Sequence, residues 1–143
     1  MTDFIRYSNN LSLLTKEAKD ALYSRLKTKT LEKGEYLLKT DEVCRHIFFI
    51  DKGLVKTCFY KSDKEFIMRF FPENSMFTVL DSYIQQTPSL FIILALEHTE
   101  ISYITNSDLE ELCKSYHCIE TYFRKLVSFA SVNMMKRISE MLE

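Results

Sequence analysis

The sequence of 143 residues contains no tryptophan, two glycines and two prolines, a composition that excludes collagen-like and low-complexity chains. It has no run of about 20 apolar residues, which is the length that a membrane-spanning helix needs. Residues 1–10 carry Asp3 and Arg6 and lack an apolar stretch, so they do not form a signal peptide. We therefore expect a cytoplasmic globular domain without a membrane partner.

An excess of charge of either sign is also missing. The chain has 19 lysines and arginines against 20 aspartates and glutamates, for a net charge of -1. Proteins that bind nucleic acid usually show a basic stripe, whereas the basic residues of the last 34 positions (110–143) are interleaved with acidic ones. We therefore expect contact with DNA only through a domain that this chain lacks.

Cysteines and histidines are too few and too scattered for a metal centre. The four cysteines form no CxxC pair, and without an export signal they are expected to be reduced thiols. Cys113, His117 and Cys118 have a helical spacing that spreads their side chains, and no fourth ligand is near. His46 begins an apolar run and is predicted to be a strand end at the surface. We expect no metal and no catalytic residues.

Between residues 28 and 105, short apolar runs alternate with turn residues, which is typical of β-strands. Gly34 and Gly53 lie between such runs, where tight turns often need a positive φ. Many short strands favour a sandwich, barrel or jelly roll, because the strand edges must be hidden. The predicted strands are 35–39, 46–50, 54–60, 65–71, 91–97 and 100–104.

Helices are predicted on both sides of this region. Residues 11–27 have apolar side chains at helical spacing, with Thr15 as the N-cap. Ser107 and Glu110 form a capping box, which predicts a short helix to about Tyr116. A long helix then follows from about Ile119 to the last residue, without glycine or proline.

The long helix carries two apolar stripes, whereas a surface helix needs only one. One stripe can pack on the β-domain and the other on the same helix of a second subunit, so we expect a homodimer. The alternative, burial between the β-domain and the first helix, stays open. The predicted dimer contacts are Leu126, Phe129, Ala130 and the polar Asn133.

This order of elements resembles the effector domain of the Crp/Fnr transcription regulators. Four segments carry the resemblance: TKTLEKGEYLLK (28–39), HIFFIDKGLVK (46–56), FFPENS (70–75) and ALEHTEI (95–101). The resemblance implies a mainly β fold, a double-stranded β-helix (jelly roll) with an N-terminal helix, a short helix and a long C-terminal dimerisation helix. Residues 1–117 would form the roll with its flanking helices and 118–143 the dimerisation helix, and the helix-turn-helix domain is absent from this chain.

In that family a cyclic nucleotide rests on a segment with a glycine, a glutamate for the ribose and an arginine for the phosphate. The corresponding segment, 77–91, has no glycine, and Ser89 stands where the arginine is expected. Asp81 is the only acid near the glutamate position, where the alignment puts Val79 or Leu80. A buried phosphate without a cation costs several kcal/mol. We therefore expect no cofactor and no binding of cyclic AMP.

A remaining cavity is expected between this segment and the long helix. It is either filled by side chains such as Leu80, Leu90 and Phe91 or adapted to a small neutral or weakly acidic effector, which the sequence does not identify. The polar candidates on the helix side are Arg124, Ser128 and Ser131.

Two other functions stay open. The chain could be a stand-alone interaction module that only dimerises, or a cupin-like enzyme, since cupins also fold as jelly rolls. A cupin brings two or three histidines and a glutamate to one metal, and His46, His98 and His117 are far apart in the sequence. The regulator interpretation is therefore preferred.

Overall fold

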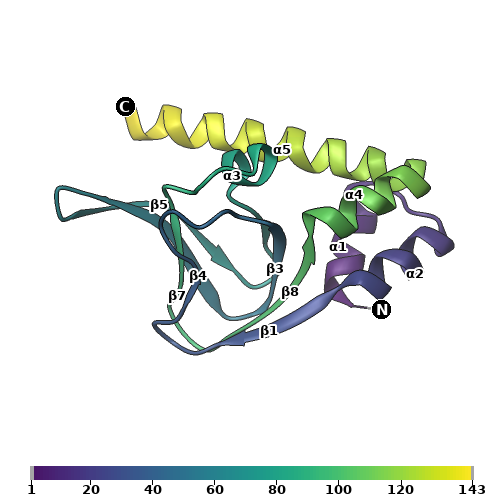
Figure 1. Cartoon of the computed structure of the whole chain (residues 1–143), viewed down its shortest axis with the longest axis horizontal. Helices are drawn as coiled ribbons and strands as arrows, with labels where there is room; N and C mark the ends of the chain where they lie inside the picture. Colours follow the sequence, from purple (N-terminus) through teal and green to yellow (C-terminus); the bar gives the residue numbers. More distant parts are fainter. Residues whose placement is uncertain (1, 143) are drawn as a thin grey trace. The chain divides into compact units, whose positions relative to one another are not determined.

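The computed structural model describes residues 2–142, which form two compact units (Figure 1). Residues 2–24 and 107–142 form a helical unit, and Arg25–Asn106 form a β-unit. The fold is mainly β, built from antiparallel sheets with helices, and the predicted long C-terminal helix is present. The helices are α1 (Asp3–Leu11), α2 (Lys16–Arg25), α3 (Leu80–Gln85), α4 (Asn106–Ser115) and α5 (His117–Leu142).

The β-unit contains two four-stranded sheets, with strand orders β1-β8-β3-β6 and β2-β7-β4-β5. Every pairing is antiparallel, and the sheets are not closed into one barrel. The six predicted strands are confirmed with small shifts of their ends. The strands are β1 (Lys27–Leu31), β2 (Tyr36–Leu38), β3 (His46–Lys52), β4 (Leu54–Lys61), β5 (Lys64–Pro72), β6 (Met76–Phe77), β7 (Ile92–Ala95) and β8 (Thr99–Thr105).

Aromatic rings connect the two sheets. Phe71 of β5 stacks on Phe77 of β6 with 4.2 Å between ring centroids, and Phe48 of β3 lies 5.5 Å from Phe77. Since β5 belongs to one sheet and β3 and β6 to the other, these rings lie between the sheets. Phe48 and Phe77 are buried, so they form part of the core of the β-unit.

The helix predicted over residues 11–27 is wrong at its start. Leu11 ends α1, and α2 begins only at Lys16, with Thr15 accepting a 3.1 Å hydrogen bond from the N–H of Ala18. Thr15 is therefore the N-cap, as predicted. Between the helices, the side chain of Asn9 accepts a 2.9 Å hydrogen bond from Leu14 N, so local side-chain capping separates two helices that hydrophobic spacing alone would join.

The helical unit is held together by α1, which the sequence analysis missed. Phe4, Ile5 and Ser8 of α1 are buried, and the hydroxyls of Ser8 and Tyr122 form a buried 2.9 Å hydrogen bond. Tyr122 belongs to the first turns of α5, so α1 is fastened to the start of the long helix. No helix within residues 2–142 has the length and hydropathy needed to cross a membrane.

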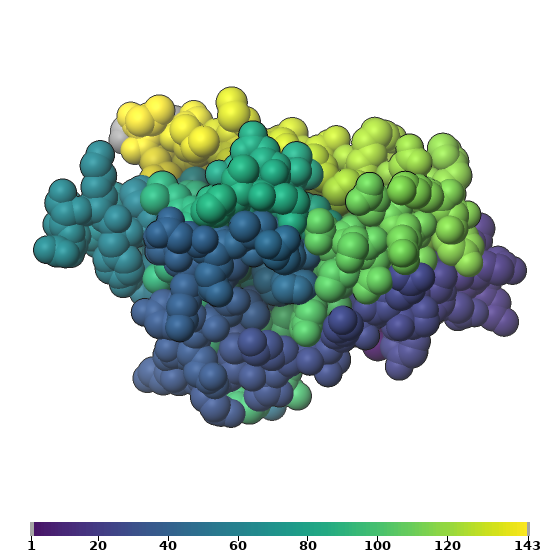
Figure 2. All heavy atoms as spheres, viewed as in Figure 1, coloured from purple at the N-terminus to yellow at the C-terminus, as the bar shows by residue number. Residues whose placement is uncertain are grey.

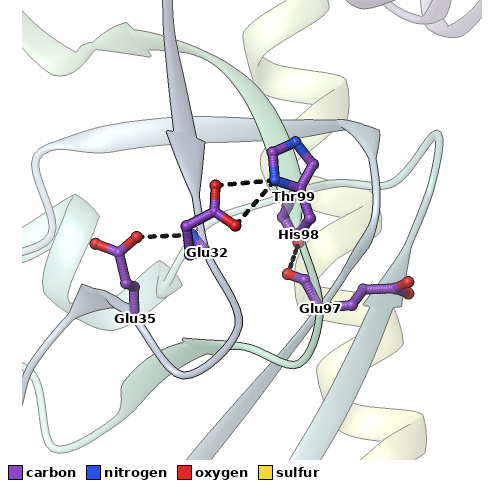
Figure 3. A network of polar contacts seen from close by, with 5 residues as sticks. All are labelled: Glu32, Glu35, Glu97, His98 and Thr99. Atoms are coloured by element: carbon purple, nitrogen blue, oxygen red, sulfur yellow. Dashed lines mark hydrogen bonds and ion pairs between the residues drawn. The ribbon is translucent and has the colours of Figure 1, made fainter.

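Both glycines have the positive φ that the turns predicted, +90° at Gly34 and +110° at Gly53. Gly53 also permits a close approach to the turn before β8. Figure 3 shows this turn: Thr99 Oγ1 donates to the carbonyl of Glu97 at 2.9 Å, and the His98 ring lies 3.0 Å from the carboxylate of Glu32. A Cβ atom at Gly53 would lie 2.6 Å from the carbonyl oxygen of His98.

Replacing Gly53 by alanine should therefore destabilise the β-unit more than replacing Gly34. A Cβ atom at position 34 meets no atom within 4 Å. Gly34→Ala should therefore lower the free energy of unfolding by only about 1 kcal/mol, the cost of holding an alanine in the left-handed conformation. Gly53→Ala adds a backbone clash, and its free energy of unfolding should fall by about 3 kcal/mol or more. Urea unfolding followed by circular dichroism measures both values, and equal losses would contradict the close approach.

Candidate functional site

The segment expected to contact a ligand contains the short helix α3. It begins after β6, and its N-cap, Val79, makes no side-chain capping hydrogen bond. Val79 is buried, Leu80 is half-buried and Asp81 is exposed. Figure 2 shows α3 as part of the teal-green surface. Ile84 of this helix is 51% exposed. Asp81, the proposed stand-in for the glutamate, therefore lies on an open surface.

Hydrogen bonds fasten both ends of this segment to the loop before β3. The hydroxyl of Ser82 accepts from the N–H of Cys44 at 2.9 Å. Further along, Ser89 O accepts from Asp41 N, and Ser89 N donates to Glu42 O, both at 2.8 Å. The backbone that would cradle a phosphate is therefore engaged with its own chain at Ser89.

The side chain of Ser89 is engaged as well. It is 2% exposed, and its hydroxyl accepts from Phe91 N and donates to Phe91 O, both at 2.9 Å. A short polar side chain thus closes a local turn at the position where the family resemblance implies an arginine. The neighbouring Leu90, a candidate for filling a pocket, is 59% exposed. The ligand contacts of Ser89 and Leu90 stay predictions.

Aromatic side chains also gather beside Phe91. Phe59 and Phe66, which face each other on β4 and β5, stack with 5.2 Å between centroids, and Phe91 meets Phe59 edge-on at 5.5 Å. Together with the Phe48–Phe77–Phe71 rings, this cluster supplies apolar surface in the β-unit. Two cations lie over its rings, Lys64 over Phe66 at 5.6 Å and Arg69 over Phe71 at 5.1 Å from the ring centroids.

The candidates on α5 have different surroundings. Arg124, Ser128 and Ser131 are exposed, and the two serine hydroxyls donate to carbonyls of their own helix, at Arg124 O (2.9 Å) and Val127 O (2.8 Å). Their ligand contacts stay predictions too. Among the predicted dimer contacts, Phe129 is 53% exposed, Asn133 is exposed, and Leu126 and Ala130 are half-buried.

The thiols are not poised for chemistry. Burial, followed by the charges of Glu120 and Glu110, raises the pKa of Cys113 to about 11. Burial and then Glu65 raise the pKa of Cys58. Both cysteines are therefore thiols at neutral pH, the form that is a poor nucleophile and a poor metal ligand. The part of the chain that the structure describes contains no group of three or more potential metal ligands.

A polar cluster on the β4–β5 hairpin was not anticipated. One carboxylate oxygen of Glu65 accepts from Lys56 Nζ at 2.9 Å and from the Tyr60 hydroxyl at 2.8 Å. These hydrogen bonds, led by that of Lys56, hold the pKa of Glu65 below its usual value. The bond to Glu65 raises the pKa of Tyr60 to about 12. The groups satisfy one another across paired strands, so the cluster stabilises the hairpin register.

His46 differs from the surface position expected for it. It begins β3, as predicted, but its ring is half-buried against Tyr103, with 4.9 Å between ring centroids. Burial lowers the pKa of His46 most, and the positive charges of nearby lysines and an arginine lower it further. Arg45 is adjacent to His46 in the sequence, but sequence spacing gave no signal of Lys27 and Lys29, because these two lysines come from β1.

Ser89→Ala tests whether that hydroxyl serves the fold. The change leaves the N–H of Phe91 without its present partner, so the free energy of unfolding should fall by about 1–2 kcal/mol. Thr87→Ala is the matched control in the same loop, because Thr87 is exposed, and it should change stability by less than about 0.5 kcal/mol. An unaltered stability of Ser89→Ala in urea unfolding would show that the hydroxyl is not needed for the turn.

Many solved structures resemble the chain, including the following three. A cyclic nucleotide-binding domain from Methylobacillus flagellatus aligns with a TM-score of 0.83 over 98% of this chain and 81% of its own, at 13% identity. Thermus thermophilus catabolite activator protein aligns with a TM-score of 0.74 over 90% of this chain, at 13% identity. The chain spans only 60% of the length of that protein. The sensor domain of the regulator DNR from Pseudomonas aeruginosa aligns with a TM-score of 0.70 and 13% identity. The alignment covers 87% of this chain and 91% of the DNR domain.

Identities this low show a common fold, and no curated protein sequence matches the chain. A sequence match provides the family. The profile of the cyclic nucleotide-binding domain family matches residues 28–116, which is more than half of the chain and includes every strand except the first residue of β1. Domains of this family are typically regulatory and not enzymatic. The chain therefore belongs to the cyclic nucleotide-binding domain family.

Proposed function

We propose that the chain is the effector-sensing and dimerisation domain of a cytoplasmic Crp/Fnr-type transcription regulator, whose nucleotide pocket has lost its phosphate anchor. The observation that carries the proposal is the exposed apolar surface of α5, a helix of 26 residues. Its C-terminal half leaves large apolar side chains in contact with water. These are Phe129, Val132, Met135, Ile138, Met141 and Leu142, between 42% and 83% exposed.

A second copy of α5 is the partner that we propose for this surface. Burying one such side chain contributes about 1.5–3 kcal/mol, so several together can stabilise a dimer. Leu126, Phe129 and Asn133 share a helix face through their spacing of three and four residues. Asn133 is exposed, and a polar residue in such a seam can fix the register of two parallel helices.

The DNA-binding role belongs to a part of the regulator outside this chain. Thermus catabolite activator protein is longer than the aligned region, whereas the DNR sensor domain is nearly covered by it. A net charge of -1 fits a sensing domain better than a DNA-reading domain. We therefore propose that α5 transmits the dimer geometry to a following DNA-binding domain.

Loss of the phosphate anchor follows from Ser89 and its surroundings. No lysine or arginine occurs between Phe70 and Ile104. The Ser89 hydroxyl is hydrogen-bonded to the backbone N–H and C=O of Phe91. A cyclic phosphate buried there would lack a counter-charge. We propose that the segment either closes on its own apolar side chains or accepts a small neutral or weakly acidic effector.

Phe129→Glu should convert the dimer to monomers, because it places a charge in the apolar seam. Leu13→Glu is the matched control, since Leu13 is also exposed (81%) but lies between α1 and α2. Sedimentation equilibrium at tens of micromolar should show a dimer for the unaltered chain and for Leu13→Glu. A monomeric unaltered chain would refute the assembly.

Calorimetry with cyclic AMP and cyclic GMP should show no saturable heat up to about 1 mM, because a buried cyclic phosphate would lack a counter-charge. A dissociation constant of about 1 mM corresponds to a binding free energy of only about 4 kcal/mol, so the experiment detects even weak binding. A cyclic nucleotide-binding domain that retains the glycine, glutamate and arginine is the positive control. A micromolar dissociation constant for either nucleotide would show that another group replaces the missing cation.

A further inference from the structure

The half-buried ring of His46 lies on the face of its sheet that also holds core residues. It contacts Tyr103 of β8 edge-on at 4.9 Å and Phe48 of β3 at 5.7 Å, measured between ring centroids. These contacts involve the ring faces and edges, and the described residues provide no hydrogen-bond partner for either ring nitrogen. One N–H and one lone pair are therefore available to a ligand.

Two lysines of β1 lie on the same face as this ring. Lys27 is directly opposite Tyr103, which is opposite Phe48 in the next strand. Directly paired residues of antiparallel strands project to the same side of a sheet, and so does Lys29, two residues after Lys27. Figure 1 shows β1 beside β8 in the β-unit. Both lysines are exposed, and each reduces the pKa of His46 through its charge.

Arg45 adds a third cation, and none of the three forms an ion pair with a carboxylate of the described residues. Its guanidinium donates to the neutral amide of Gln86 at 3.3 Å. Within residues 2–142, neither Lys27 nor Lys29 forms an ion pair or a hydrogen bond through its side chain. The titratable groups around the ring are thus Lys27 and Lys29 on β1, Arg45 beside it and Tyr103 on β8. Unbalanced positive charge in a chain of net charge -1 is a local feature that an anion would relieve.

We propose that Lys27, Lys29, Arg45 and His46 form a binding site for the phosphoryl group of a small molecule. Two ammonium groups, a guanidinium and an imidazole N–H offer more donors than the two oxygens of a carboxylate can use, whereas a dianionic phosphoryl group has three such oxygens. Residues i and i+2 of a strand are about 7 Å apart, so the lysines can reach the group from two directions.

The site goes beyond the proposed function, because it requires neither a dimer nor the segment around Ser89. A bound dianion favours the charged imidazolium, so it should raise the pKa of His46 towards and above the ordinary value of about 6.5. By the same linkage, binding of the dianion should strengthen as the pH falls through that pKa, down to about pH 6, where the phosphoryl group itself takes up a proton. The test therefore has a direct spectroscopic signal at a named residue.

The experiment is a titration of the full chain with inorganic phosphate, observed through the imidazole C2–H resonances by NMR. The sequence has three histidines, and His98 and His117 are internal controls. At constant ionic strength the His46 resonance should shift saturably, with its pKa raised by about one unit, while chloride should have no such effect. Adenosine 5′-monophosphate and adenosine separate recognition of the phosphoryl group from recognition of the group attached to it.

Lys27→Gln and Lys29→Gln should each weaken phosphate binding by about tenfold, the effect expected from loss of one charge-assisted hydrogen bond. Lys33→Gln is the matched control, since Lys33 is an exposed lysine of the same unit in the β1–β2 turn, and it should bind phosphate normally. The site is refuted if phosphate shifts His46 no more than chloride does. It is equally refuted if the Lys27→Gln/Lys29→Gln double variant, confirmed to be folded by its NMR spectrum, responds like the unaltered chain.

Discussion

The contact between the two sheets is the interaction on which the β-unit depends, because neither sheet can bury its apolar face alone. Phe71 on Phe77, and Phe77 near Phe48, form a stack that passes from one sheet to the other. Stacked rings contribute about 1 kcal/mol beyond the burial of their surface. The side chains that hold the sheets together therefore occupy part of the interior between them.

Polar groups of the α3 segment are likewise used by the fold. The Ser82 hydroxyl accepts a hydrogen bond from Cys44 N, and the Ser89 hydroxyl donates one to Phe91 O. The side-chain amide of Gln86 donates to Cys44 O at 3.2 Å. Among the described residues, no buried side-chain nitrogen or oxygen lacks a hydrogen-bond partner. A segment that presents donors to a phosphate must leave those donors free, and the polar groups of Ser82, Gln86 and Ser89 are engaged within the chain. The engagement of these groups and the absence of lysine and arginine between Phe70 and Ile104 thus support the same proposal.

The sequence pattern predicted the β-region well, because short apolar runs such as that of β3 are separated by turn residues, and both glycines lie in turns with positive φ. It missed β1, where four of five residues are exposed, and β6, which has two residues, since neither provides a hydrophobic period. It joined residues 11–15 to α2 because the capping by Thr15 and Asn9 depends on side-chain hydrogen bonds. The surroundings of His46 were beyond reach, because the lysines that act on it are 17 and 19 residues earlier in the sequence.

The cations near His46 lie close to both ends of the β-unit along the chain. β1 begins two residues after α2 ends at Arg25, and β8 ends at Thr105, the residue paired with His46, before α4 begins at Asn106. Arg45 O also accepts from Asn106 N at 2.8 Å. An anion held by Lys27 and His46 therefore acts on residues beside both chain connections. A bound anion stabilises the states that hold these cations together, and it shifts a conformational equilibrium only by its difference in affinity between states.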